Sequence, residues 1–313
     1  MAIGFLNLDK PAGFTSHDCV SKVRRAMQQR LVGHGGTLDP AATGVLPIAI
    51  GRATRFLQYL PSQKRYRATF QLGRESTTDD AEGEILRTTS AIAIALPDVE
   101  LALQQFSGEI AQVPPIYSAI RKQGKRLYEL AREGVKPEEI DIQPRAVQIQ
   151  RIELLDWRAG ELAEVDVDII CGAGTYIRAI ARDLGRALGV GGLMSVLRRS
   201  QSGAFLEADS IPLETFLALE HPEAVLKPVE SALTGLPAVR LETDAARRWC
   251  CGQAIALPKL SDIRSDINDI NNDSPPNLDS PLVQVLSDRD DFLGLGRAES
   301  DRLLPERVLA SRG

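Results

Sequence analysis

Residues 32–47 read VGHGGTLDPAATGVLP, the part of the chain most densely interrupted by glycine and proline. The stretch holds four glycines, two prolines, one histidine and one carboxylate. This density of glycine and proline excludes a long helix or a central strand. The stretch therefore predicts a tight, shaped loop that displays a single acidic side chain, Asp39.

Asp39 has two interpretations. It is the only Asp or Glu between Asp18 and Glu75, and Arg52 and Arg55 follow on the next segment. A lone carboxylate among cations can be held ionised, as a nucleophile or a base requires. Alternatively, Asp-Pro is a common way to start a turn, and the carboxylate then only caps that turn.

The composition is that of an ordinary globular protein. The chain has 313 residues, of which 43% are hydrophobic and 25% charged, and this length suggests two domains or one large domain with an appendage. No run of eighteen apolar residues occurs and the N-terminus does not resemble a signal peptide, so we expect a cytoplasmic protein without a membrane span. The spacing of cysteines and histidines predicts reduced thiols and no metal site; these residues are Cys19, Cys171, Cys250, Cys251, His17, His34 and His221.

Charge is unevenly distributed along the chain. The formal net charge is −5, from 37 basic and 42 acidic residues. Residues 1–75 nevertheless contain eleven basic and four acidic residues, whereas residues 259–313 contain seven basic and eleven acidic ones. A basic first quarter and an acidic tail predict a localised face for an anionic ligand.

Periodicity predicts the main elements. Alternating apolar and polar residues, or short apolar runs, predict strands at 3–8, 64–73, 84–87, 147–155 and 162–171. Helical spacing predicts helices at 16–29, 98–106, 127–132 and 176–188, the first with Ser16 as its N-cap. Arg178 falls in the first turn of the last helix, where a cation opposes the helix dipole, so a specific partner is expected for it.

The pattern changes around Gly235. Residues 236–258 and 281–309 look like short strands separated by turns. Residues 259–280 are rich in Asp, Asn, Ser and Pro, and we expect a disordered insertion there. Residues 121–126 carry four cations around a glycine, a run that by itself is typical of a solvated surface loop.

Five motifs, in the same order along the chain, resemble those of the bacterial tRNA pseudouridine-55 synthases. They are Gly33–Pro40 with Asn7–Gly13 upstream, Lys64–Arg67, Tyr117–Ala119, Gly174–Arg178 and Leu197–Arg199. Each motif alone is weak, but together they are a strong signal. The resemblance covers roughly residues 3–205 well and the C-terminal part loosely.

The resemblance implies an α+β fold. Its catalytic domain, at 1–235, would hold a mixed, largely antiparallel sheet flanked by helices. A small RNA-binding β-barrel of the PUA type would follow at 236–313, with the expected disordered insertion at 259–280.

The implied reaction isomerises uridine to pseudouridine at position 55 in the T-loop of tRNA. The N1–C1′ bond breaks, the uracil rotates, and C5 joins C1′, without a redox change and without a cofactor or metal. Asp39 would be the catalytic nucleophile or base, with Arg178 paired to it. The uridine must leave its stack, and Tyr66 would stack on the base while Tyr176 and Leu197 line its pocket.

Further residues follow from the same resemblance. His34 would fill the space of the flipped nucleotide or contact its neighbours. Lys122, Lys125 and Arg126 would neutralise RNA phosphates, and Lys10 would support the loop or a phosphate. For Asp80 we favour a plain turn carboxylate over a partner for an arginine.

Three other functions remain open at this stage: a non-catalytic chaperone or binding module for the tRNA T-arm, a guide-dependent synthase inside a ribonucleoprotein, and a carboxylate-nucleophile hydrolase. The second usually needs protein partners and Lys-rich tails, and the third needs a second acidic motif for a metal. We therefore expect a monomer that acts on the tRNA T-arm without an obligate protein partner.

Overall fold

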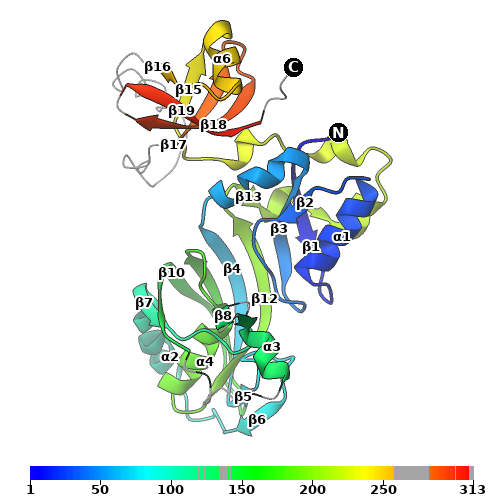
Figure 1. Ribbon diagram of the computed structural model, residues 1–313. Coiled ribbons are helices and arrows are strands. Elements are labelled where there is room, and N and C mark those ends of the chain that lie inside the picture. Colours follow the sequence, from blue (N-terminus) through cyan, green and yellow to red (C-terminus); the bar gives the residue numbers. More distant parts are fainter. Residues whose placement is uncertain are drawn as a thin grey trace.

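The computed structural model describes residues 1–118, 120–122, 124–133, 135, 140, 142–256, 282–299 and 301–309, without the side chains of Arg121, Lys122, Arg126, Tyr128, Ala131 and Arg132. The insertion predicted at 259–280 therefore lies outside the described residues. Within them, two separate sheets organise the chain, and Figure 1 shows the C-terminal one apart from the rest.

The larger sheet has ten strands in the order β14-β1-β3-β12-β4-β11-β10-β7, with β2 added to β3 and β13 to β12. All neighbours are antiparallel except β1 with β14 and β3 with β12. The expected mixed, largely antiparallel sheet is thus confirmed. Its strands are β1 (Gly4–Lys10), β2 (Val32–His34), β3 (Thr43–Ile50), β4 (Lys64–Leu72), β7 (Gly108–Gln112), β10 (Arg145–Arg158), β11 (Glu164–Cys171), β12 (Gly192–Ser202), β13 (Phe205–Leu206) and β14 (Ile211–Pro212).

Helices and short hairpins surround this sheet. The α-helices are α1 (Ser16–Ala26), α2 (Leu96–Leu103), α3 (Leu127–Arg132), α4 (Ile177–Ala187) and α5 (Leu213–Leu217). The 3₁₀ helices are η1 (Gly51–Tyr59), η2 (Gln104–Phe106), η4 (Glu207–Asp209), η5 (Pro222–Val225) and η6 (Glu230–Ala232). Two hairpins pair β5 (Arg74–Ser76) with β6 (Ile85–Thr88) and β8 (Arg121–Lys122) with β9 (Lys125–Arg126). None of the helices in the described ranges is long and apolar enough to cross a membrane.

The C-terminal sheet has the order β15-β17-β18-β19-β16 and carries α6 (Thr243–Cys250) beside it. Its strands are β15 (Ala238–Leu241), β16 (Ile255–Ala256), β17 (Leu282–Ser287), β18 (Phe292–Glu299) and β19 (Arg302–Val308). This half-barrel, with its own small apolar core around Trp249, fits the PUA-like domain that the resemblance implied.

Strand β4 lies between β12 and β11 in the larger sheet, and its residue pattern explains why this segment forms a strand with one buried face. Its buried and less buried positions alternate, with Tyr66, Phe70 and Leu72 on the inner face. The inner face packs into the main apolar core, which α1 and α4 also line. In Figure 1, β4 and β12 join the half of the sheet beside α1 to the half beside α4.

The start of α1 differs from the prediction. The N-cap is Thr15, whose side chain accepts from the Asp18 amide while the Asp18 carboxylate accepts from the Thr15 amide. This reciprocal capping box satisfies two free amides and moves the cap one residue earlier than Ser16. The helix ends at Ala26 instead of Gln29, and Gln28 has a positive φ of 50°. Ser16 is thereby free for a different contact.

Candidate active site

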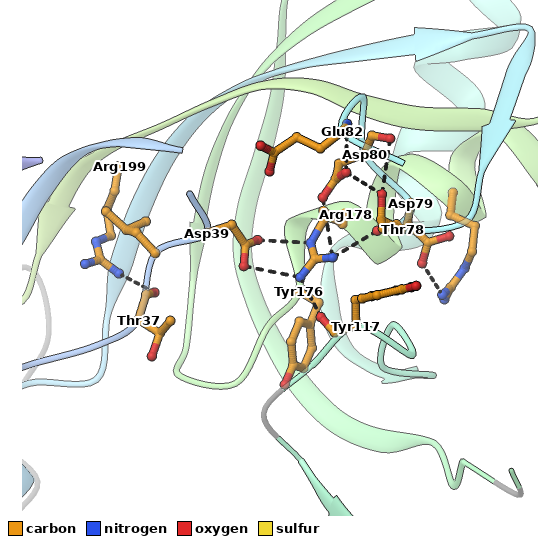
Figure 2. Close-up of polar contacts among 12 residues, drawn as sticks. Thr37, Asp39, Thr78, Asp79, Asp80, Glu82, Tyr117, Tyr176, Arg178 and Arg199 are labelled. Carbon is orange, nitrogen blue, oxygen red and sulfur yellow. Dashed lines mark hydrogen bonds and ion pairs between the residues drawn. The ribbon is translucent and has the colours of Figure 1, made fainter. Parts of the chain in front are cut away.

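The loop between β2 and β3 carries Asp39 at its tip. The Ala42 amide donates to the Asp39 carbonyl at 3.1 Å, so Asp39 does start a tight turn. Its carboxylate points away from that turn toward α4, as Figure 2 shows. The Asp39 backbone thus starts a turn, and the Asp39 carboxylate remains free of that turn. The two interpretations of this residue are therefore compatible.

Two residues from the N-terminal segment fix this loop. The Ser16 hydroxyl donates to the Leu38 carbonyl at 3.1 Å, and the Leu38 amide donates back to it at 2.9 Å. The Lys10 ammonium, fully buried, donates to the Pro40 carbonyl at 3.0 Å and to two carbonyls of its own turn. The backbone on both sides of Asp39 is thus held in place.

Arg199 of β12 braces the same loop from beneath. Its guanidinium, 1% exposed, donates to the carbonyls of Gly36, Thr37 and Val45 at 3.1, 3.3 and 2.7 Å. The close approach depends on Gly44, because a Cβ there would lie 2.3 Å from the Arg199 carbonyl oxygen. Gly44 also has a φ of +102°, which favours glycine.

Arg178, at the start of α4, meets the Asp39 carboxylate. Its Nε lies 3.0 Å and its Nη2 3.3 Å from the two carboxylate oxygens, a bidentate pair. The same guanidinium, 5% exposed, donates to the carbonyls of Thr78 and Tyr117 at 2.9 and 3.0 Å. The expected partner for a cation in this unfavourable helix turn is therefore present (Figure 2).

Asp80 lies on the other side of Arg178, and its position corrects the sequence-based interpretation of Asp39. Its Oδ2 is 3.5 Å from the Arg178 Nη1, and it is 7% exposed. It is also the turn carboxylate that we favoured, since it accepts from the Thr78 hydroxyl and the Glu82 amide. Asp39 is thus not a lone carboxylate: two acids share one guanidinium (Figure 2).

The surroundings of Asp39 raise the pKa of its carboxyl. Loss of water contact is the main cause and the Asp80 charge adds to it, while Arg178 and Lys10 oppose the shift. The side chain still keeps 35% of its surface exposed. A carboxylate that is accessible but less stabilised than in water is well suited to act as a base or nucleophile.

A second arginine one helical turn further fastens the Thr78–Asp80 turn to α4. Arg182 donates to the Asp79 carboxylate at 2.9 Å and to the Val113 carbonyl at 2.8 Å. Asp79 has a positive φ of 61°, a strained conformation that this pair helps to hold. Arg178 and Arg182 together keep Asp80 next to the site.

Tyr66 and Leu197 are both 8% exposed and belong to the main apolar core. Burial raises the pKa of the Tyr66 hydroxyl. Arg199 lies opposite Tyr66, and Leu197 lies opposite Ala68, in the register of β12 against β4. Two of the predicted base-pocket residues, Tyr66 and Leu197, therefore lie on the paired strands β4 and β12, close to Arg199.

Tyr176 immediately precedes α4 as its N-cap, without a side-chain cap bond. Gln112 fixes its backbone, accepting from the Tyr176 amide at 2.8 Å and donating to its carbonyl at 3.1 Å. The Tyr176 ring is half-buried and lies beside the Arg178–Asp39 pair in Figure 2.

His34 ends β2 and is half-buried. Its Nδ1 accepts from the Gly36 amide at 3.3 Å, and its ring contacts that of His17 at 5.3 Å between centroids. Burial, followed by the neighbouring His17, lowers the pKa of His34, which favours the neutral ring at neutral pH.

The four cations expected at RNA phosphates are not equivalent. Lys10 is fully buried and donates to three carbonyls, contacts that favour support of the loop over a phosphate. Lys125 is exposed on β9 and pairs with Glu133 at 2.8 Å. Lys122 and Arg126 lie in the same hairpin, but their side chains fall outside the described part.

Sequence reasoning missed Arg199 as a member of this arrangement, and for Asp80 it favoured the turn carboxylate over the arginine partner that the structure also shows. Arg199 stood inside the quoted Leu197–Arg199 motif, and its inward position on a buried strand was the available signal. Asp80 carried no such signal, because it is separated from Asp39 by 41 positions and lies in an ordinary polar turn.

Comparison with known protein families covers nearly the whole chain. Residues 24–177 match the N-terminal domain of the TruB family pseudouridylate synthases, residues 178–234 the tRNA pseudouridylate synthase B C-terminal domain, and residues 237–309 the C-terminal domain of pseudouridine synthase II TruB.

Individual proteins give the same result. The tRNA pseudouridine synthase B of Trichormus variabilis is 46% identical over 310 residues, covering 97% of this chain and 98% of the relative. That of Gloeobacter violaceus is 46% identical over 308 residues, covering 98% of each.

Among solved structures, a Cbf5-Nop10-Gar1 complex contains a chain with a TM-score of 0.72 and 28% identity, covering 99% of this chain and 85% of that one. An H/ACA RNP bound to a substrate RNA containing 2′-deoxyuridine contains one with a TM-score of 0.71 and 26% identity, covering 99% and 86%.

Proposed function

Since the chain belongs to the TruB family of pseudouridylate synthases, we propose that it converts uridine 55 in the T-loop of tRNA into pseudouridine. The observation that carries the proposal is the accessible Asp39 carboxylate, held by the bidentate Arg178 and fixed on a loop with braced backbone. The full-length relatives named tRNA pseudouridine synthase B support tRNA as the substrate.

Asp39 would begin the reaction at the uridine. As a nucleophile or as a base it promotes cleavage of the N1–C1′ bond. The freed uracil turns within the site, C5 forms the new bond to C1′, and C5 then loses its proton while N1 gains one. The product has the same atoms as the substrate, so no group leaves the RNA.

Arg178 keeps the Asp39 oxygens aimed, because its guanidinium is fixed at three further acceptors. When negative charge moves from the carboxylate to the substrate, Arg178 can stay in place and pair with Asp80. Because Arg178 is shared by the two carboxylates, few side chains have to move when the negative charge leaves Asp39.

The base would be held by residues of the two central strands and of α4. The uridine has to leave its stack to reach Asp39, and Tyr66 would provide an aromatic face for it. Tyr176 and Leu197 would close the pocket, and the neutral His34 ring would contact the neighbouring nucleotide. Lys122, Lys125 and Arg126 would bind the RNA backbone.

We further propose that the chain acts in the cytoplasm, where tRNA is available, as a monomer without an obligate protein partner. The ribonucleoprotein titles of the solved neighbours describe those proteins. No observation on this chain favours the non-catalytic T-arm chaperone.

The test uses the purified chain and an unmodified T-arm stem-loop labelled with 5-³H-uridine. Asp39→Asn should abolish tritium release while binding of the stem-loop stays nearly intact, because the substitution changes one atom of an aimed carboxylate. Asp290→Asn, in the exposed turn between β17 and β18, is the control and should react like the parent. Residual turnover of Asp39→Asn near the parental rate would remove Asp39 from the mechanism, whereas binding of the stem-loop without tritium release by the parent chain would favour the chaperone.

A further inference from the structure

Three cations beneath the Asp39 loop are buried without an acidic partner. Lys10, Lys64 and Arg199 are 0%, 9% and 1% exposed, and none forms an ion pair among the residues that the structure describes. The buried Arg178 and Arg182, by contrast, both pair with carboxylates. A buried charge is costly unless it is well compensated, so each unpaired cation requires an explanation.

Lys10 and Arg199 are explained by their hydrogen bonds, and Lys64 is not. Lys10 and Arg199 each donate to three carbonyls. Among the residues that the structure describes, Lys64 has a single acceptor, the Pro61 carbonyl, at 3.4 Å. An ammonium group can donate three bonds, so within this part of the chain Lys64 keeps two unused donors at a position that is only 9% exposed.

A second unsatisfied group lies beside Lys64. Ser202 is the direct cross-strand partner of Lys64 in the register of β12 against β4. Its side chain is 2% exposed, and its hydroxyl has no hydrogen-bond partner in the described part of the chain. Directly opposed residues on neighbouring strands point to the same face, so two groups with unused donors occupy adjacent positions.

The position of Lys64 relates it to the base pocket. It stands two residues before Tyr66 on the inner face of β4, a separation of about 7 Å along the strand. Its Cε lies 3.9 Å from where a Cβ of Gly36 would be, and the Arg199 Nη1 lies 3.5 Å from the same point. Lys64 and Arg199 are therefore neighbours under the loop that carries Asp39.

We propose that Lys64 and the Ser202 hydroxyl bind one backbone phosphate of the flipped uridine nucleotide. The inference rests on the proposed function, because it takes RNA as the ligand. In the proposed complex Tyr66 would stack on the uracil. A group two residues away on the same face of β4 lies about 7 Å from Tyr66, which is roughly the distance across a ribose from the base to its backbone phosphate. That spacing favours the phosphate over the uracil itself. A phosphate offers several oxygens, enough for the free donors of both residues.

The ionisation of Lys64 agrees with this assignment. Burial, with the Arg199 charge as a second cause, lowers the pKa of Lys64 to about 8. An incoming phosphate stabilises the charged form and raises that pKa again. RNA binding above pH 8 should therefore be accompanied by proton uptake at this residue.

The experiment combines a protein change with an RNA change. Stem-loops carrying a single neutral methylphosphonate at successive positions around the uridine are titrated into Asp39→Asn protein, which leaves the substrate unconverted. One position should weaken binding about tenfold, the loss of one charged hydrogen-bonded contact. With Lys64→Met added, the penalty at that position should fall below twofold, while Lys227→Met, at an exposed ion pair with Asp209, should leave it at tenfold.

Thermal melting of the free protein provides a second measurement. Lys64→Met should raise the melting temperature, because it removes an unpaired buried charge that only the RNA compensates. An unchanged methylphosphonate penalty in Lys64→Met, or a lower melting temperature with uniformly weaker binding, would overturn the phosphate site. Failure of the wild-type chain to form pseudouridine would instead overturn the proposed function, since the binding comparison does not depend on turnover.

Discussion

At the scale of single residues, Asp39 illustrates what the sequence could predict and where it fell short. Its loop, its accessibility and its pairing with Arg178 agree with the expectation drawn from the motifs. The expectation of a lone carboxylate among cations was wrong, because folding brings Asp80 to the same guanidinium. Local sequence records neither the loss of water contact that is the main cause of the raised Asp39 pKa nor the distant Asp80 charge that adds to it.

The raised pKa of Asp39 has a consequence for the pH dependence. The proposed reaction requires the ionised Asp39 carboxylate, so kcat/KM should fall with decreasing pH through a pKa above the ordinary aspartate value. Asp80→Asn removes a neighbouring negative charge and should move this acidic limb to lower pH. Its plateau rate should fall roughly tenfold, because Arg178 loses a charged contact worth about 1.4 kcal/mol.

The measurement is a pH profile of pseudouridine formation on the stem-loop for both proteins. Asp209→Asn is the control, since Asp209 forms an exposed pair with Lys227 and is not among the causes of the Asp39 shift. Its acidic limb should coincide with that of the parent. A limb that stays in place in Asp80→Asn would show that the two carboxylates do not interact.

At the scale of elements, the periodicity of the sequence predicted whether most segments are helices or strands. The capping residues predicted the ends of these elements less well. The alternation at 64–73 became β4, and the spacing at 176–188 became α4. The same alternation places Lys64 in phase with Tyr66, but it could not show what Lys64 contacts there, because the partners of a polar residue on a buried face come from elsewhere in the sequence. Ser16 was assigned to a cap that Thr15 supplies, and its contact with Leu38 joins segments 22 positions apart.

The brace between β3 and β12 can be tested at Gly44. Gly44→Ala should destabilise the fold by about 3 kcal/mol or more, because the new Cβ meets the Arg199 backbone in a conformation that already strains an L residue. Turnover should fall as well, since Arg199 moves with its loop contacts. Urea denaturation and stem-loop turnover measure the two effects.

Gly13→Ala is the matched control for this change. Gly13 has a φ of +80°, but a Cβ there meets nothing within 4 Å. Gly13→Ala should therefore lower the free energy of unfolding only by the cost of a left-handed backbone conformation, about 1 kcal/mol. Equal effects at the two glycines would mean that the contact with Arg199 does not hold the loop.

At the scale of the whole molecule, the change of pattern near Gly235 indicated a separate C-terminal part, and its position against the larger sheet could not be read from the sequence. That position depends on contacts between distant segments. Phe56 of η1 and Phe292 of β18 lie 5.7 Å apart between ring centroids, and the Tyr59 hydroxyl donates to the Glu306 carboxylate at 2.8 Å. Leu295 of β18 completes an apolar cluster built mostly from the larger sheet and its helices.

This junction leads to a prediction about substrate size. Phe292→Ala should weaken the attachment of the C-terminal sheet by about 1–3 kcal/mol, through the loss of an aromatic pair and its buried area. Calorimetry should then separate the unfolding of the two sheets. We expect a T-arm stem-loop to contact only the larger sheet and to react at the parental rate, whereas full-length tRNA, which we expect to contact both sheets, should show a higher KM.

Leu293→Ala separates attachment from stability, because this side chain packs into the core of the C-terminal sheet itself. It should lower the melting temperature of that sheet and leave the KM for full-length tRNA nearly unchanged below the transition. If Phe292→Ala affected the stem-loop and the full-length tRNA equally, the orientation of the C-terminal sheet would have no part in tRNA recognition. The apolar junction at Phe56 would then serve only to bury surface.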